Sequence, residues 1–287
     1  MKHIFKDGIF VECLKDKYWL GFEYTEWWWK ITSTEDVINN IKEIVCECYD
    51  EEEDEYGISN IVWISIFKNL KVLVLTNNQI KELPKEIWKL EKLKVLYLEW
   101  NKLQELPKEI GNLKNLEELW LGDNKIEELP KEIGKLKNLE KLFLFYNQLQ
   151  WLPKEIWNLK NLEVLALTSN QLQKLPKEIW NLKNLKELYL NLNQLQELPK
   201  EIGKLENLEE LYLWWNKIKE LPKEILELDN LKEIQLENAF DLYNLKQDPK
   251  ELLDILKKLE NNNVIDDYSL EYLKEKVYLF LESKIRI

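Results

Sequence analysis

Apolar and polar residues alternate over short stretches that recur along most of the chain. In "LEELWLGDN" (116–124), Leu119 and Leu121 are separated by one residue, which is typical of one face of a short strand. The stretch before it, "LPKEIGNL" (106–113), has a proline as its second residue, which can open a helical turn because its missing N–H is not needed there. Its isoleucine and last leucine are expected to point back towards the strand. The pattern predicts a strand, a turn and a short helical segment in each unit.

This unit repeats with a period of 23 residues. Seven prolines, each within "LPKEI", and seven asparagines, each ending a strand pattern, keep that spacing: Pro84, Pro107, Pro130, Pro153, Pro176, Pro199 and Pro222, with Asn78, Asn101, Asn124, Asn147, Asn170, Asn193 and Asn216. One unit cannot bury its leucines alone, whereas stacked units can, with parallel strands about 4.8 Å apart. Each asparagine amide is expected to bond backbone groups that the turn leaves unpaired, forming a ladder from coil to coil.

The pattern "LxxLxLxxNxLxxLPxxIxxL" resembles the leucine-rich repeats of the 23-residue class, typified by Ras-suppressor-like proteins and common in bacteria. The resemblance covers residues 61–243, about two-thirds of the chain. It implies an α/β fold, a curved solenoid with a parallel sheet on its concave face and short helical turns on its convex face. In that family the concave face usually binds a protein partner, which fold analogy does not identify.

The chain is expected to have three parts, at residues 1–59, 60–243 and 244–287. The first has no repeat; "GIFVEC", "YWLGFEY" and "WWWKI" read as strands and "STEDVINNIKEIVCECYD" as a helix, which predicts a small α+β cap or subdomain. The second predicts about eight coils, and its asparagine ladder should stop where Ala239 replaces the asparagine.

The third part is expected to form a helical C-terminal cap. "QDPKELLDILKKLE" reads as a helix with Asp248 as N-cap and Pro249 as first residue. Its stripe of Leu252, Leu253, Leu256 and Leu259 would cover the last coil. "DYSLEYLKEKVYLFLESKIRI" predicts a second helix, although its tail also alternates like a strand.

The charge of the chain argues against several partners. The net charge is −12, and residues 1–60 alone hold 6 Lys and 15 Asp or Glu, so 6 − 15 = −9. A phosphate backbone needs a basic footprint, so no nucleic-acid partner is expected. No apolar run reaches the roughly 18 residues of a membrane span. No secretory signal is recognised and three cysteines form no disulfide framework, so a cytoplasmic location is expected, with other export routes left open.

No catalytic site, metal site or cofactor is expected. His3 is the single histidine, and there is no glycine-rich phosphate loop. Cys46 and Cys48 could join Cys13 and His3 around zinc, but in the expected helix residues two apart face away from each other. The acidic run "DEEEDE" (50–55) lacks the spacing of a calcium loop and reads as a solvated segment.

Aromatic residues gather at the positions expected on the concave face. In the six full repeats (83–220), the residue between the two strand leucines and the two residues after the second leucine make 18 positions, of which 10 are aromatic. The charged convex positions of the same repeats hold none. An exposed aromatic cluster usually marks an interaction site. The candidate partner-binding residues are Tyr97, Trp100, Trp120, Phe143, Phe145, Tyr146, Ala166, Tyr189, Leu192, Tyr212, Trp214 and Trp215.

The candidate face also has a predicted relief. One bank of aromatic residues (97–146) and another (189–215) flank a repeat with small residues, Val164, Ala166, Thr168 and Ser169, which predicts a notch. Acidic residues accompany the aromatic ones: Glu99, Glu118, Asp123, Glu187, Glu210 and Glu233, with Lys141 as the main basic exception. A partner with apolar anchors and some Lys or Arg is therefore expected.

The sequence favours a non-catalytic module that binds a partner protein through this face. Glycan binding and self-association are the alternatives, so the chain is expected to be a monomer or to associate weakly. An effector unit in residues 1–59 and a consensus-type design are also open. Trp88, Trp157 and Trp180, on the convex side, are interpreted as half-buried packing.

Overall fold

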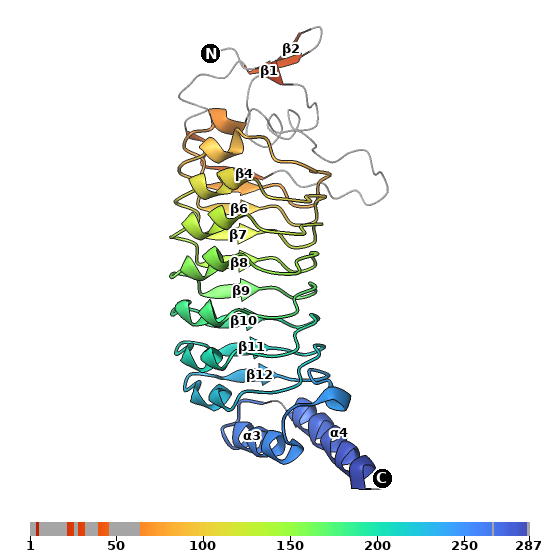
Figure 1. The fold of residues 1–287 in the computed structure, drawn as a ribbon. Helices are drawn as coiled ribbons and strands as arrows, with labels where there is room; N and C mark the ends of the chain where they lie inside the picture. Colours follow the sequence, from red (N-terminus) through yellow and green to blue (C-terminus); the bar gives the residue numbers. More distant parts are fainter. Residues whose placement is uncertain are drawn as a thin grey trace. The chain divides into compact units, whose positions relative to one another are not determined.

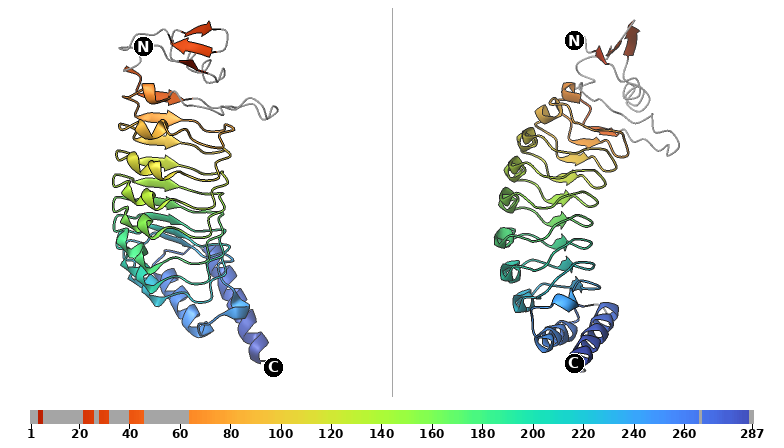
Figure 2. Two further views of the ribbon diagram at one scale, coloured as in Figure 1. Left: turned by 45° about the horizontal axis from the view of Figure 1, so that its top comes forward. Right: turned by 45° about the vertical axis from the view of Figure 1, so that its right-hand side comes forward.

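A computed structural model describes residues 4–5, 22–25, 28–31, 40–45, 64–265 and 267–285. The chain divides into two compact units, Met1–Leu142 and Phe143–Ile287. In both units each coil contributes one short strand and one short 3-10 helix, and within each unit these two kinds of element occupy opposite sides of the stack (Figures 1 and 2).

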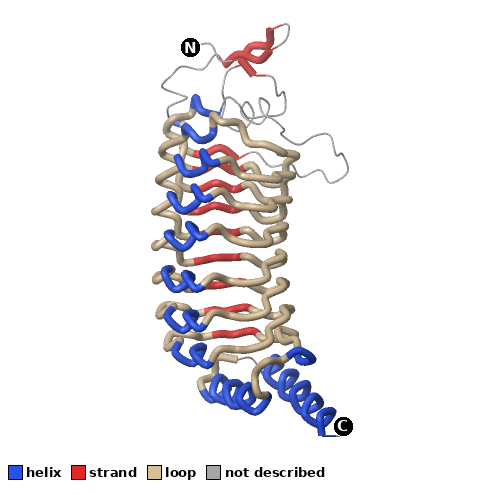
Figure 3. The backbone as a smooth tube through the Cα atoms, viewed as in Figure 1, coloured by secondary structure: helices blue, strands red, loops and turns tan. Residues whose placement is uncertain are grey.

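The strands of the first unit are β4 (Glu43–Val45), β5 (Val72–Val74), β6 (Val95–Tyr97) and β7 (Glu118–Trp120), and β8 (Lys141–Phe143) contains the boundary. Those of the second are β9 (Val164–Ala166), β10 (Glu187–Tyr189), β11 (Glu210–Tyr212) and β12 (Glu233–Gln235). They follow chain order, and their pairing is parallel and in register, so that Leu73, Leu96 and Leu119 lie side by side. Figure 3 shows this stacking, which confirms the predicted repeat fold.

The helical turns of the first unit are η1 (Ile64–Ile66), η2 (Ile87–Lys89), η3 (Lys108–Asn112) and η4 (Lys131–Lys135). The second unit holds η5 (Lys154–Asn158), η6 (Lys177–Asn181), η7 (Lys200–Lys204), η8 (Lys223–Glu227) and η9 (Leu242–Asn244). In η3 to η8 the proline is the residue just before the helix, not its first residue. The Pro107 carbonyl accepts a bond from the Ile110 N–H, which turns that isoleucine into the core.

The asparagine ladder forms as predicted. The side-chain amide of Asn101 donates to the carbonyl of Leu98 in its own coil and to that of Leu75 in the preceding coil, at 3.0 and 2.9 Å. Its Oδ1 accepts the N–H of Ile80 at 3.1 Å. Buried backbone groups at every turn are therefore paired, while each fully buried leucine adds about 1.5–3 kcal/mol of hydrophobic stabilisation.

The ladder ends at Ala239, also as predicted. There the backbone carbonyl of Ala239 replaces the amide oxygen and accepts the N–H of Ile218 at 2.8 Å. Gln247 pairs the backbone groups of Leu221. Its side-chain oxygen accepts the Leu221 N–H and its side-chain amide donates to the Leu221 carbonyl, both at 3.1 Å. The last coil thus keeps its backbone groups paired without an asparagine.

The amino-terminal segment contains an antiparallel sheet of β1 (Ile4–Phe5), β2 (Phe22–Thr25) and β3 (Trp28–Ile31), in the order β1-β3-β2. Strands within "YWLGFEY" and "WWWKI" are confirmed, whereas "GIFVEC" lies outside the described residues. The predicted helix is wrong at Glu43–Val45, because β4 pairs in parallel with β5. Ile44 is fully buried there, so a repeat strand lies before the expected boundary at residue 60.

The carboxyl-terminal helices are confirmed. They are α3 (Pro249–Asn261) and α4 (Asp267–Ile285), and the alternating tail is helical up to Ile285. Asp248 caps α3 by accepting the N–H of Lys250 at 2.8 Å, and the predicted leucine stripe is buried. Within the described ranges no helix is long and apolar enough to span a membrane.

Candidate functional site on the strand face

The strand face is the surface made by the strand residues that alternate with the buried leucines, together with the two residues after the second leucine. In the first unit, the register of β6 and β7 places Tyr97 beside Trp120. Their ring centroids are 5.3 Å apart with the planes tilted by 33°. The indole N–H of Trp120 donates to Glu118 at 3.2 Å, which fixes the ring on the strand. Both rings are half-buried, so each keeps one side open to solvent.

Two acidic residues of the first unit differ in their surroundings. Glu118 forms an ion pair with Lys141 at 3.1 Å. The side chain of Glu99 is only 7% exposed, and no hydrogen bond or ion pair reaches its carboxylate from the described part of the chain. Burial raises the pKa of Glu99 from 4.5 to about 7, because the charged form loses its hydration.

In the second unit, a tyrosine hydroxyl is hydrogen-bonded to glutamate carboxylates on the strand face. The rings of Tyr189 and Tyr212 meet edge to face, with centroids 4.9 Å apart. The Tyr189 hydroxyl lies 2.8 Å from Glu187 Oε2 and 2.9 Å from Glu210 Oε2, so one hydrogen serves two carboxylates. Burial and these two carboxylates raise the pKa of Tyr189. Burial, together with Glu210 and Glu233, raises the pKa of Tyr212 to about 12.

Three carboxylates stack in this second unit. Glu187, Glu210 and Glu233 are direct neighbours in the parallel register of β10, β11 and β12. In the part of the chain that the structure describes, no lysine forms an ion pair with any of them. Like charges that face each other across strands are destabilising, so this row is a region of unbalanced negative charge.

Of the small residues predicted as a notch, Val164 and Ala166 lie on β9, and Thr168 and Ser169 follow it. Val164 and Ala166 face the same side as the tyrosines but are buried, whereas the outward residues of the other repeat strands from β5 to β12 are half-buried. Ala166 lies beside Tyr189, and its carbonyl accepts the N–H of Leu144 at 2.8 Å. Larger neighbours therefore cover these small side chains. The two predicted banks draw on both units, so the notch between them stays a prediction.

The residue just before each of the seven ladder asparagines, and before Ala239 in the last coil, has a left-handed backbone. Its φ lies between 49° and 57° in all eight coils, at Asn77, Trp100, Asp123, Tyr146, Ser169, Leu192, Trp215 and Asn238. Asparagine and aspartate tolerate this conformation, whereas bulky side chains are strained in it. Trp100, Tyr146 and Trp215 are nevertheless 51%, 53% and 54% exposed, and so recover little energy from packing.

Sequence reasoning placed these residues on the face but missed their backbone conformation. It also missed Trp151, which is 56% exposed at a register position that holds glutamate or lysine in the other full repeats. That contrast within the repeat was the available signal. Trp151 lies beyond the strand, just before "LP", and so does not belong to the strand face as defined here.

The interpretation of the convex tryptophans as half-buried is wrong for the two whose side chains are described. Trp88 and Trp157 are buried, because neighbouring coils close over the indole rings, and the buried N–H of Trp157 has no hydrogen-bond partner. Trp180 has a side chain outside the described residues. In the same register, a Cβ on Gly111 would lie 2.9 Å from the Glu132 carbonyl oxygen, so the coils at that point approach too closely for a side chain.

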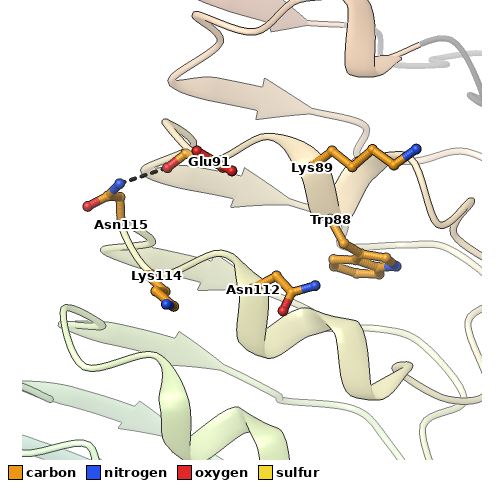
Figure 4. A pocket seen from close by; sticks show the side chains of 6 residues that line it. All are labelled: Trp88, Lys89, Glu91, Asn112, Lys114 and Asn115. Carbon is orange, nitrogen blue, oxygen red and sulfur yellow. Dashed lines mark hydrogen bonds between the residues drawn. The ribbon is translucent and has the colours of Figure 1, made fainter.

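A cavity of about 490 Å³ lies on the helical side of the first unit, lined by Trp88, Lys89, Glu91, Asn112, Lys114 and Asn115 (Figure 4). The Asn115 amide donates to the carbonyl of Glu91 at 2.7 Å across this cavity. The same bond recurs from Asn138 to Lys114 and, in the second unit, from Asn207 to Lys183. These bonds form a second asparagine ladder, which joins neighbouring coils and borders the cavity. From the sequence, these positions were interpreted only as part of a charged surface.

The described residues contain no group of three or more His, Cys, Asp or Glu that could hold a metal ion. The considered set of His3, Cys13, Cys46 and Cys48 lies outside the described residues, as does the acidic run at 50–55. The chemistry that the strand face offers is aromatic stacking, hydrogen bonding and negative charge.

Three family models match the chain, and all describe leucine-rich repeats. "Leucine rich repeat" matches residues 61–103, "Leucine Rich repeats (2 copies)" matches 114–154, and "Leucine Rich Repeat" matches 184–205. Among curated proteins, none matches the chain.

Several solved structures are similar. A leucine-rich repeat protein of Leptospira interrogans is 43% identical, with a TM-score of 0.52, over 68% of this chain and 54% of that one. The chain thus spans about half of that protein's length. Internalin C2 of Listeria monocytogenes is 24% identical, with a TM-score of 0.67, over 81% of this chain and 94% of that one, which shows the fold alone.

A plant structure is also similar. The ectodomain of the membrane receptor kinase GASSHO1/SCHENGEN3 of Arabidopsis thaliana was solved in complex with CASPARIAN STRIP INTEGRITY FACTOR 2. It is 27% identical, with a TM-score of 0.54, over 69% of this chain and 27% of that one.

Proposed function

The chain is a leucine-rich repeat protein, and from this premise we propose that its strand face binds a partner protein without catalysing a reaction. Leucine-rich repeat proteins are generally protein-interaction modules, which sets the class of function. The Arabidopsis ectodomain, solved with CASPARIAN STRIP INTEGRITY FACTOR 2, supports the same use of the fold.

The observation that carries the proposal is the choice of residues at the left-handed position. The fold imposes the same φ on every coil, and other coils satisfy it with Asn77, Asp123 or Asn238. Trp100 and Trp215 occupy it instead and remain more than half exposed. A bulky residue there costs on the order of 1 kcal/mol relative to a tolerant one. Since packing within the chain offsets little of this cost, binding to a partner is the better explanation.

The proposed contact residues are the aromatic and small residues singled out in the sequence, each on the strand face of its own unit. Exposed aromatic side chains bury a large area on binding while few rotatable bonds are fixed, which is why they dominate binding energy at protein interfaces. The acidic residues between them favour a partner that carries basic groups next to its apolar anchors.

The test uses Trp100→Asn and Trp215→Asn, since asparagine suits this backbone. Asp123→Asn is the matched control, because it changes the same position without removing an aromatic ring. We expect each tryptophan variant to lower partner capture from a lysate of the source cells at least tenfold, with an unchanged circular dichroism spectrum. Equal capture by the wild type and both tryptophan variants would contradict the proposal.

Sedimentation velocity separates binding from self-association. We expect the wild type to sediment as a monomer at concentrations where the partner is captured. A dimer that both tryptophan variants abolish would instead assign the aromatic face to contacts between copies of this chain.

A further inference from the structure

We infer that the Glu99 carboxylate, beside the aromatic pair Tyr97 and Trp120, receives a cationic side chain, arginine or lysine, of the partner protein. This inference rests on the proposed function and names the chemistry that the strand face of the first unit recognises. It commits to an organic cation, because one isolated carboxylate is not a metal site.

The backbone places Glu99 on the strand face. It follows Leu98 of the core by one residue, and the alternation along the strand puts it on the side of Tyr97. Its carbonyl accepts the Asn77 N–H at 2.9 Å, which keeps it in the stack. Its register neighbours are Thr76 and Gly122, which bring a hydroxyl and no side chain, so neither can neutralise the carboxylate.

Within the described residues, the Glu99 carboxylate has no hydrogen-bond or ion-pair partner. The residue is 7% exposed, and its carboxylate oxygens still touch solvent, since neither is a buried atom without a partner. Lys141, one strand beyond the adjoining β7, is held by Glu118 at 3.1 Å. A buried carboxylate without a partner is unfavourable, because dehydration is not offset by an opposite charge. A cation that arrives with the partner would supply the missing charge.

The surroundings suit an organic cation. The rings of Tyr97 and Trp120 lie with centroids 5.3 Å apart and planes tilted by 33°, and Trp100 adds an exposed indole at the next residue after Glu99. Guanidinium and ammonium groups are attracted to aromatic faces, and tryptophan is the strongest of these. The guanidinium group of an arginine would therefore bond the carboxylate, while its methylene chain lies against the rings.

The protonation of Glu99 supplies a signature. Burial raises the pKa of Glu99 to about 7. The pKa of Tyr97 is raised by burial and by the charges of Glu118 and Glu99. On the outward side of the adjoining strands and their turns, the titratable residues are Glu118 of β7 and Asp123 after it, and Lys141 lies one strand further on, in β8. A bound cation favours the ionised carboxylate and so lowers the pKa of Glu99.

The experiment follows the Glu99 carboxyl carbon by NMR in the full chain, with and without Nα-acetyl-arginine amide as the probe. We expect the probe to lower the pKa of Glu99 and to bind about thirty-fold more weakly at pH 5.5 than at pH 8.5, the ratio that a pKa near 7 dictates. Nα-acetyl-citrulline amide, which has the same shape without charge, should leave the pKa unchanged.

Two variants make the assignment specific. Glu99→Gln should abolish the pH dependence of probe binding, whereas Glu237→Gln, at the same register position in the second unit, should retain it. An unchanged Glu99 pKa in the presence of the probe, or equal binding by Glu99→Gln, would overturn the inference. If the tryptophan variants still lose the partner in that case, the proposed function is supported, and only the binding of a cationic side chain at Glu99 is rejected.

Discussion

The two units build their strand faces on the same backbone but balance acidic charge differently. In the first unit the outward residue at the start of β7, Glu118, is paired with Lys141. In the second unit the same position holds Glu187, Glu210 and Glu233 in a row, and the Tyr189 hydroxyl shares its hydrogen between two of them. The repeat therefore fixes where side chains lie, while the pairing of their charges is set separately in each unit.

The difference also separates two kinds of acidic residue. The row in the second unit is half-buried and in contact with solvent, so water screens part of its repulsion. Glu99 in the first unit is only 7% exposed, and partial dehydration of its carboxylate is what raises its pKa. Substitutions at these positions should accordingly differ in size, in pH dependence and in salt dependence.

The largest effect is expected at Glu99. Below about pH 4.5 the carboxyl is protonated in both the folded and unfolded states, so its ionisation contributes nothing. As pH rises towards 7, the unfolded state releases its proton while the folded state retains it, and the free energy of unfolding falls. Glu99→Gln should therefore stabilise the chain by roughly 2 kcal/mol at pH 8 and by little at pH 4.

Urea denaturation at the two pH values measures this difference. Glu237→Gln, which replaces a half-buried carboxylate at the same register position, should change stability by less than about 0.5 kcal/mol at both. A gain from Glu99→Gln that is equal at pH 4 and pH 8 would mean that dehydration of the charge is not its cause.

Trp100→Asn and Trp215→Asn should come next. Each relieves a bulky residue from a left-handed backbone, one in each unit, and should raise the free energy of unfolding by about 1 kcal/mol. The reverse change, Asp123→Trp, should lower it by a similar amount. Thermal unfolding of the three variants checks both signs, and a loss of stability in both tryptophan variants would show that the rings pack more than their exposure suggests.

The smallest effect compares the charge pairs themselves. Glu118→Gln breaks an ion pair and should destabilise the first unit by about 0.5 kcal/mol. Glu210→Gln keeps an acceptor for Tyr189 but removes the central charge of the row, and should stabilise the second unit by about 0.5 kcal/mol. Denaturation at low salt and at about 1 M salt should show both effects shrinking, since salt screens partly exposed charges. Effects of the same sign would remove the contrast between the units.

Much of the fold followed from sequence because its signals are periodic. The leucines, the prolines and the asparagine ladder recur every 23 residues, and the C-terminal helices carry their own caps and stripes. Glu43–Val45 escaped this reasoning because three residues near the start of a solenoid hold too little pattern to separate strand from helix. Pairing with β5 decided it.

The candidate site was only half visible in the sequence. Alternation with the core leucines placed Tyr97 on the strand face, because such residues point the other way. The repeat register placed Trp100 and Trp215 at the end of the strand, where the chain turns. Their partner-binding role remains a proposal. The burial of Trp88 and Trp157 was not visible, since it depends on how closely neighbouring coils approach.

The sequence by itself determined the repeat, the side of the strand on which each residue lies, and the acidic and aromatic character of the strand face. These properties depend on the spacing of residues along the chain, which the sequence gives directly. Only the tertiary structure decided that Trp100 and Trp215 adopt positive φ, that Glu99 is 7% exposed with no partner for its carboxylate among the described residues, and that Tyr189 bridges two carboxylates. Those properties arise from contacts between coils 23 residues apart, where distance and dehydration are set by packing and not by the local pattern.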